Sequence, residues 1–312
     1  MSAVLKLTEG TKVEVTTIAT AAVLLDLNVS VWSGRKRDKK TSEEVTTSKG
    51  AGSTKAASVI KNLMSDDADL DAIKAYAQGL RNYVQTNTLT WTDGGTRLLP
   101  SRSIFEVTNE IEARAKQFDI LVDKFVDNYS IKVSAAAFKL GALFDRTEYP
   151  DPQVVRRKFN VRYVISPVPT AGDFRVDVQN DVGEFLQKQY KEAAERRLID
   201  LMRETCERAY ETLKHMQERL QATLEHEGDE LGDKRKQPKL YQSMLDNAVE
   251  MATMLDRLNV MGDGQLADCA ARIRRLVAPL DIKSLRESKD TQASAKKQVE
   301  DILSAFSFGS LE

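Results

Sequence analysis

The chain has 312 residues and a formal net charge of −1 at pH 7, although 30% of its residues are charged. This balance suits the exposed faces of long helices and gives no overall electrostatic sign of nucleic-acid binding. A hydrophobic content of 41% is sufficient for a core. No run of eighteen apolar residues and no leader-like segment is visible, so we expect a soluble cytoplasmic protein that does not contact membranes.

The first hundred residues predict a small α+β part, residues 1–100. Alternating apolar residues over 12–32 predict a half-buried β-hairpin. Apolar residues within 59–64 predict a short helix, and those within 70–84 predict a longer one. Residues 89–98 surround an Asp-Gly-Gly turn and predict a second small hairpin.

Two long amphipathic helices are predicted over 104–144 and 183–227. In each, apolar residues recur at alternating gaps of three and four, which keeps one seam of a helix against a partner. The first seam contains Ile104, Thr108, Ile111, Ala115, Phe118, Val122, Phe125 and Tyr129, then, after a register shift, Val133, Ala136, Leu140 and Leu143; the second contains Ile199, Met202, Cys206, Ala209, Leu213, Met216 and Leu220. We therefore predict a long, antiparallel, coiled-coil-like helical hairpin within residues 101–235.

Between these helices, alternating apolar residues predict a β-hairpin over about 159–178, at the tip of the helical hairpin. The tip offers more apolar surface than the ends of two helices would bury. Phe159, Tyr163 and Phe174 are therefore candidate partner-binding residues. The long seams and this exposed hairpin also predict a homo-oligomer.

Residues 236–312 predict a C-terminal segment of shorter helices, with apolar stripes over 240–258, 266–277 and 299–306. Four methionines of this segment would suit an adaptable binding face, although a stripe of this kind more often belongs to a core. They are Met244, Met251, Met254 and Met261.

No catalytic, cofactor or metal signature appears, so we predict no enzymatic activity, no cofactor and no metal site. The glycine-rich stretch 50–55 lacks the adjacent Gly-Lys-Ser/Thr of a nucleotide-binding loop. His215 and His226, the only histidines, do not have a zinc-binding spacing. Cys206 and Cys269 both fall on apolar helix faces, which indicates buried free thiols.

A basic run directly follows the first strand and a tryptophan. The tryptophan is Trp32, and the basic residues are Arg35, Lys36, Arg37, Lys39 and Lys40; together they are the candidate nucleic-acid-binding residues. The cations would suit phosphate contacts and the indole would stack on a base, so nucleic-acid binding is the alternative function. A solvated turn is the simpler interpretation, because a single basic run is weak evidence for nucleic-acid binding in a chain of nearly zero net charge.

The stretch 24–36, Leu-Leu-Asp-Leu-Asn-Val-Ser-Val-Trp-Ser-Gly-Arg-Lys, is followed by long helices. In this respect the chain resembles an uncharacterised family of phage and prophage proteins, a domain of unknown function. The resemblance implies a phage-encoded protein of the host cytoplasm. It also implies an adaptor, because members are sometimes encoded beside a MoxR-type AAA ATPase and a von Willebrand A protein. It supplies no catalytic residues.

Together these patterns predict a mainly α protein that is a non-enzymatic interaction or scaffold component. The expected partners are a second copy of the chain and an AAA ATPase. A lesser alternative comes from the likeness between a helical hairpin with a β-tongue and α-helical pore-forming toxins. That alternative is disfavoured because the tip carries Arg162, Arg175 and Asp177, which are costly to insert into a bilayer.

Overall fold

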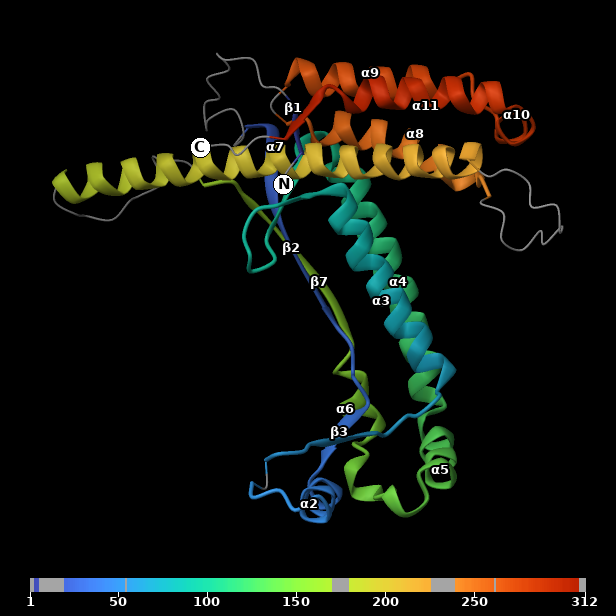
Figure 1. The fold of residues 1–312 in the computed structure, drawn as a ribbon. Helices are drawn as coiled ribbons and strands as arrows, with labels where there is room; N and C mark the ends of the chain where they lie inside the picture. The colour runs from blue at the N-terminus through green and yellow to red at the C-terminus, as the bar shows by residue number, and fades with distance from the viewer. Residues whose placement is uncertain are drawn as a thin grey trace. The chain divides into compact units, whose positions relative to one another are not determined.

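The computed structural model describes residues 3–5, 20–53, 55–169, 180–225, 239–260 and 262–308. The fold is mainly helical with a small antiparallel sheet, as predicted (Figure 1). The chain divides into two compact units: unit 1 contains residues 1–26, 85–105 and 165–312, and unit 2 contains residues 27–84 and 106–164. Each unit draws on distant parts of the sequence, so the units cut across the three consecutive parts that were predicted.

The described helices, in chain order, are α2 (Lys39–Ser48), α3 (Ala68–Asn87), α4 (Ile104–Asp127), α5 (Tyr129–Leu140), α6 (Pro152–Arg156), α7 (Asn180–Glu225), α8 (Gln242–Leu258), α9 (Gly264–Val277), α10 (Ile282–Glu287) and α11 (Lys289–Leu303). The described strands are β1 (Ala3–Leu5), β2 (Ala22–Ser30), β3 (Arg35–Asp38), β4 (Val59–Asn62), β5 (Leu89–Thr90), β6 (Arg97–Pro100), β7 (Asn160–Pro167) and β8 (Phe306–Phe308). One sheet has the order β5-β6-β2-β7, and β3–β4 and β1–β8 form separate two-stranded ribbons.

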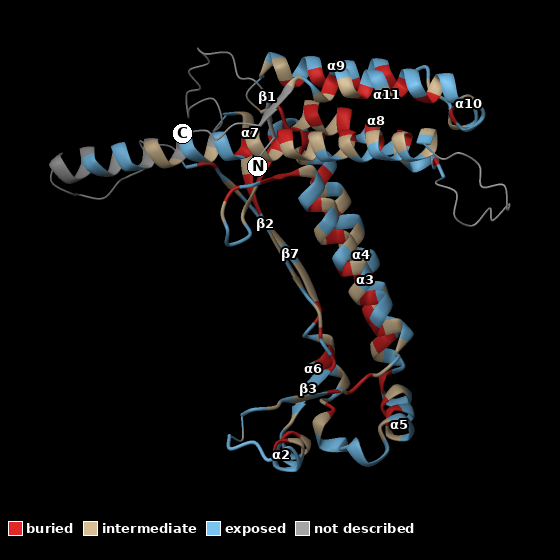
Figure 2. Ribbon diagram, in the orientation of Figure 1, coloured by how far each residue is buried: buried red, intermediate tan, exposed pale blue. Residues whose placement is uncertain are grey.

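In unit 2, helices α3 and α4 run antiparallel. Near the start of α3, Asp69 pairs with Lys124 of α4 at 2.9 Å, whereas near its end Tyr83 lies 4.8 Å from the guanidinium of Arg114. Buried residues follow both helices in Figure 2 and form one core cluster. Its members include Trp32, Leu70, Ile73, Ala77, Phe118, Val122, Phe125, Tyr129 and Phe159. The predicted seam of α4 is therefore buried in part: Ile111, Phe118, Val122 and Phe125 are buried, and the last three share their cluster with α3. Ile104, Thr108 and Ala115 are only partly buried, and Leu143, at the end of the predicted seam, is exposed.

The helix predicted over 104–144 is two helices, α4 and α5, which meet at Asn128. The Asn128 side chain donates from Nδ2 to the carbonyl of Lys124 at 2.9 Å, a local hydrogen bond that competes with the regular helix ladder. The break coincides with the register shift between Tyr129 and Val133 in the predicted seam. Both of these residues are buried on α5 and belong to the same core cluster as α4.

In unit 1, the long helix α7 packs on α8 and α11 through part of its predicted seam, since Ile199 is exposed and Met202 is only partly buried. Cys206, Ala209, Leu213, Met216 and Leu220 belong to a buried cluster that also contains residues of α8, α9, α10 and α11. The seams of α4 and α7 therefore have other partners among the described residues. The antiparallel hairpin predicted between these two helices is not confirmed.

One predicted local structure is wrong and two are not confirmed. Residues Val59–Asn62 form the strand β4, paired with β3, where a short helix was predicted. The neighbour of β7 in the sheet is β2, and residues 170–179 lie outside the described residues, so the tip hairpin is not confirmed. Residues 11–19 also lie outside them, and β2 pairs with β6 instead. The second small hairpin, β5–β6, is confirmed.

Candidate functional site

The basic run is divided between two elements of unit 2: Arg35, Lys36 and Arg37 lie on β3, which forms a two-stranded antiparallel ribbon with β4, and Lys39 and Lys40 begin α2. Gly34, with a φ of +64°, turns the chain into β3. Across the ribbon, Lys36 lies opposite Lys61 and Arg37 lies opposite Ile60. Directly opposed residues of an antiparallel pair share a face, and successive residues alternate between faces. Arg37 and Ile60 therefore lie on one face of the ribbon, and Lys36 and Lys61 on the other.

Lys61 fixes its face of the ribbon to the rest of unit 2. Its side chain is only 6% exposed, and Nζ lies 2.6 Å from Glu148 and 3.6 Å from Asp38. The same ammonium donates a hydrogen bond to the carbonyl of Leu143 at 2.7 Å. Burial alone would lower the pKa of Lys61, but the contacts with the carboxylates of Glu148 and Asp38 outweigh it and raise the pKa above its ordinary value.

The remaining cations of the run point to solvent. Arg35, Arg37, Lys39 and Lys40 are exposed, and within the described part of the chain none of them makes an ion pair; these four residues are called the basic face below. Lys36 differs from them because it is half-exposed and lies 3.9 Å from Glu148. Asp38, between Arg37 and Lys39, caps α2 by accepting a hydrogen bond from the Thr41 amide, and this contact lowers its pKa. Its carboxylate therefore stays ionised, and it also lies 3.6 Å from the ammonium of Lys61.

Trp32 is not part of this surface, contrary to the sequence prediction. It is 7% exposed, and its ring centroid lies 6.3 Å from that of Phe125 and 5.9 Å from that of Tyr129. The indole therefore fills the core of unit 2 and is not available to stack on a base. The basic face retains phosphate-binding groups without the predicted aromatic platform.

The three predicted partner-binding residues do not form an exposed surface in the described structure. Phe159 is 3% exposed and packs against Phe118 and Phe125 at centroid distances of 6.4 and 5.9 Å, so its predicted role is wrong. Tyr163 is partly exposed, and its hydroxyl donates to Glu112 at 2.9 Å, which raises the pKa of Tyr163. Phe174 lies outside the described residues.

A groove of about 380 Å³ in unit 1 brings methionines from two helices together. Its lining includes Met216 from α7 and Met244, Met251 and Met254 from α8, with Glu211 and Glu250 also contributing. Met216 and Met251 are buried, Met244 and Met254 are half-buried, and both glutamates are exposed. Three of the four methionines singled out from the sequence therefore meet here, while Met261 lies outside the described residues. The groove has an adaptable apolar wall and an acidic component.

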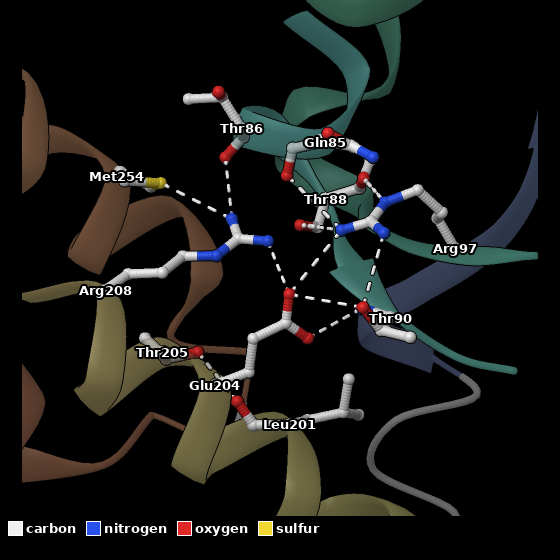
Figure 3. A network of polar contacts seen from close by, with 10 residues as sticks. All are labelled: Gln85, Thr86, Thr88, Thr90, Arg97, Leu201, Glu204, Thr205, Arg208 and Met254. Carbon is white, nitrogen blue, oxygen red and sulfur yellow. Dashed lines mark hydrogen bonds and ion pairs between the residues drawn. The ribbon is translucent and has the colours of Figure 1, made fainter. Parts of the chain in front are cut away.

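A polar network in the same unit connects α7 to the β5–β6 hairpin and to the end of α3 (Figure 3). Glu204 accepts hydrogen bonds from the amide of Thr90 at 2.8 Å and from its hydroxyl at 3.3 Å. The carboxylate also pairs with Arg208, and with Arg97 at 3.6 Å. Arg208 extends the network by donating to the carbonyl of Thr86 at 3.2 Å.

Arg97 is the second hub of this network. Its guanidinium donates to the hydroxyl and carbonyl of Thr88, at 2.6 and 3.0 Å, and to the carbonyl of Gln85 at 3.3 Å. Burial lowers the pKa of Arg97, and the charge of Glu204 opposes that shift. Because the charged groups of Glu204, Arg97 and Arg208 are engaged with protein partners, we interpret the network as a structural clamp. No sequence pattern predicts this network, because its residues are spread over more than a hundred positions.

The structure shows no metal centre within the residues it describes, since no three His, Cys, Asp or Glu side chains gather there in a way that could hold an ion. Cys206 and Cys269 are buried free thiols, as predicted, and burial raises the pKa of Cys269 to about 12.

Of the described helices, none is both long and apolar enough to span a bilayer. No protein-family model matches the chain, and neither does any curated protein or solved structure.

Proposed function

We propose that this chain is a non-enzymatic binding protein whose basic face contacts the phosphate backbone of a nucleic acid. The observation that carries the proposal is the exposure of Arg35, Arg37, Lys39 and Lys40 without an ion-pair partner among the described residues. Arginine and lysine supply most phosphate contacts in nucleic-acid complexes. Lys39 and Lys40 also stand in the first turn of α2, where the helix dipole adds a partial positive charge.

The backbone at these positions is fixed before any ligand arrives, because Arg35 and Arg37 lie on the β3–β4 ribbon and Lys39 and Lys40 on α2. Its opposite face is fixed through Lys61, and Val59 of β4 donates its amide to the hydroxyl of Ser42 in α2 at 2.9 Å. A preorganised surface loses less conformational entropy on binding. Because Trp32 is buried, the proposal is limited to backbone contacts, and we expect little dependence on base sequence.

A salt titration tests this proposal. The wild-type protein should bind a labelled 20-nucleotide single strand, and log K should fall with log[salt] at a slope of about −3, because about four phosphate contacts each release roughly 0.7 counterion. Replacing Arg35, Arg37, Lys39 and Lys40 with Ala should bring the slope close to zero. Fluorescence anisotropy at several salt concentrations measures both slopes.

The matched control removes four exposed lysines from unit 1, namely Lys239, Lys283, Lys289 and Lys297, each replaced with Ala. This variant changes the net charge by the same amount, so it separates a local contact from a general charge effect. It should keep the wild-type slope. The proposal is wrong if the wild-type protein shows no binding at low salt, or if both variants lose affinity equally.

A second candidate function, the protein adaptor predicted from the sequence, is favoured by the methionine groove of unit 1. Methionine side chains adapt to varied apolar partners, and Glu211 and Glu250 would attract basic residues at their edges. We infer that the groove would accept an amphipathic helix with lysine or arginine beside its apolar face. A phage-encoded setting and an AAA ATPase as the source of that helix remain part of this proposal, supported only by the resemblance of residues 24–36.

The adaptor candidate predicts selective binding of a basic amphipathic peptide. A designed peptide of leucine and lysine should bind with measurable heat in titration calorimetry, and its glutamate counterpart should not. Glu211→Gln with Glu250→Gln should weaken binding about tenfold, since each lost charge pair contributes on the order of 0.5–1 kcal/mol at an exposed site. Glu287→Gln with Asp290→Asn removes two exposed carboxylates of unit 1 that do not line the groove and should have no effect. Equal losses in both variants would reject the groove as the binding site.

A further inference from the structure

Helix α5 of unit 2 has an apolar stripe on the side away from its core. Tyr129, Val133 and Ala136 are buried on one face. On the opposite face, Ile131 is 70% exposed and Phe138 is 90% exposed, with the exposed Ala135 between them. The spacing i, i+4, i+7 places these three residues in line along one side of the helix. Single exposed apolar residues are common on protein surfaces, but a stripe of this kind indicates a contact surface.

The stripe is also free of charge. The lysines of α5 are engaged elsewhere in unit 2: Lys132 lies 2.8 Å from Asp67 and 2.6 Å from Asp69, and Lys139 donates to the carbonyl of Ser65 at 3.0 Å. The hydroxyl of Ser134, beside the stripe, donates to the carbonyl of Ser130 at 3.1 Å. Burying this surface would therefore leave neither a charge nor the Ser134 hydroxyl without a partner.

We propose that this face of α5 is the contact between two copies of the chain, related by a two-fold axis that passes near Ala135. In a two-fold contact the same surface meets itself, so any charge on it would face a like charge. A neutral stripe avoids this repulsion, whereas a charged partner would find no complementary group on it.

The order of side chains along the stripe fits an antiparallel arrangement. Ala135 is small and lies between the two large residues, so the helices can approach closely at the axis. Phe138 then packs against Ile131 of the partner subunit, and Ile131 packs in the same way against Phe138 of the partner subunit. Each large side chain of one copy therefore meets a large side chain of the other.

The size of the surface indicates a weak dimer. A twelve-residue helix is about 18 Å long. Three apolar side chains from each copy bury well below the roughly 1,200 Å² of a standard stable interface. We therefore expect self-association only at micromolar concentrations or above, as in transient assemblies.

Disulfide trapping tests the arrangement directly. The native cysteines are buried, so an introduced surface cysteine is the principal reactive thiol. Ala135→Cys should form a covalent dimer under mild oxidation, because a disulfide requires Cα atoms within about 7 Å and the axis brings the two copies of this position together. Ala72→Cys makes the same substitution at an exposed position on α3 and should give little dimer. Equal cross-linking of the two variants would overturn the proposal.

Sedimentation velocity supplies an independent measurement on the unmodified chain. The wild-type protein should shift toward a dimer as its concentration rises from about 5 to 500 µM, the range expected for a small interface. Phe138→Ser should weaken the dimer at least tenfold and leave the fold intact, because Phe138 makes almost no contact within its own subunit. Phe105→Ser, at an 82% exposed phenylalanine outside the stripe, should associate as the wild type does. A wild-type protein that stays monomeric over this range contradicts the proposal.

Discussion

Replacing Lys61 with Ala should lower the free energy of unfolding of unit 2 by about 3–5 kcal/mol, the cost of leaving a buried carboxylate without its partner. Glu148, whose side chain is 12% exposed, would keep only the half-exposed Lys36 nearby. Asp38 would lose its contact with the ammonium, and the carbonyl of Leu143 would lose its donor. The ribbon that carries the basic face would lose its main polar attachment to unit 2.

The two tryptophans allow each unit to be followed separately. Trp32 belongs to the core of unit 2 and Trp91 to a core cluster of unit 1, and the chain has no others. Urea unfolding of Lys61→Ala, measured by Trp32 fluorescence in a Trp91→Phe background, gives the loss of stability. Lys74→Ala, which removes an exposed i,i+3 pair with Asp71, should change stability by no more than about 0.5 kcal/mol. If Lys61→Ala and Lys74→Ala lower the free energy of unfolding by similar amounts, the buried contacts of Lys61 contribute no more to the stability of unit 2 than an exposed ion pair does.

The same lysine predicts a change in stability at high pH. The folded-state pKa of Lys61 is raised above its ordinary 10.5, so its contribution is fully present below that value. It is lost as the pH rises through the higher folded-state pKa. Wild-type unit 2 should therefore lose stability above about pH 10.5, and Lys61→Ala should lack this component of the alkaline loss.

Replacing Glu204 with Ala should destabilise unit 1 by about 2–4 kcal/mol, because its carboxylate connects a strand amide to two guanidinium groups. Its side chain is 24% exposed, and those of Arg97 and Arg208 are 14% and 22% exposed, so both cations are only partly hydrated once their partner is gone. The amide of Thr90 would also lose its acceptor. Glu204→Gln keeps that acceptor and should cost roughly half as much.

Trp91 reports this change in a Trp32→Phe background. Asp200→Ala provides the comparison, because Asp200 pairs with Arg203 on the same helix in an exposed i,i+3 contact. Its expected effect is within about 0.5 kcal/mol. If Glu204→Ala behaves like Asp200→Ala, the clamp contributes little to the stability of unit 1.

Helix positions were predictable because their apolar stripes have one dominant period, as in 70–84, 240–258 and 266–277. Which helices pack against one another was not predictable from the sequence. The seams of α4 and α7 have matching lengths, but α4 shares a buried cluster with α3, and α7 packs on α8 and α11. Nothing in the spacing of apolar residues distinguishes these arrangements, because any seam of suitable length can bury another.

The candidate site was predictable in part, and its errors have a common cause. The exposed cations of the basic face follow from local charge, because charged side chains rarely bury without a partner. The roles of Trp32 and Phe159 do not follow from local sequence. Each lies close in the chain to exposed basic residues, yet each turns into the same aromatic core. Strand β4 was missed because all four residues of its pairing strand, β3, are charged, so β3 has no alternation of apolar and polar residues that would predict a strand.

The division of the chain also constrains how it can be cut into fragments. In the two-unit division the backbone crosses from one unit to the other four times, after Asp26, Val84, Phe105 and Val164. A fragment of residues 27–164 would contain all of unit 2 together with residues 85–105, which belong to unit 1. In that fragment Leu89, Trp91 and Leu98 would be separated from Leu201 and Leu258, with which they form a buried cluster, and their apolar surface would face water. Truncation should therefore produce an aggregation-prone protein unless this segment is replaced by a short polar linker.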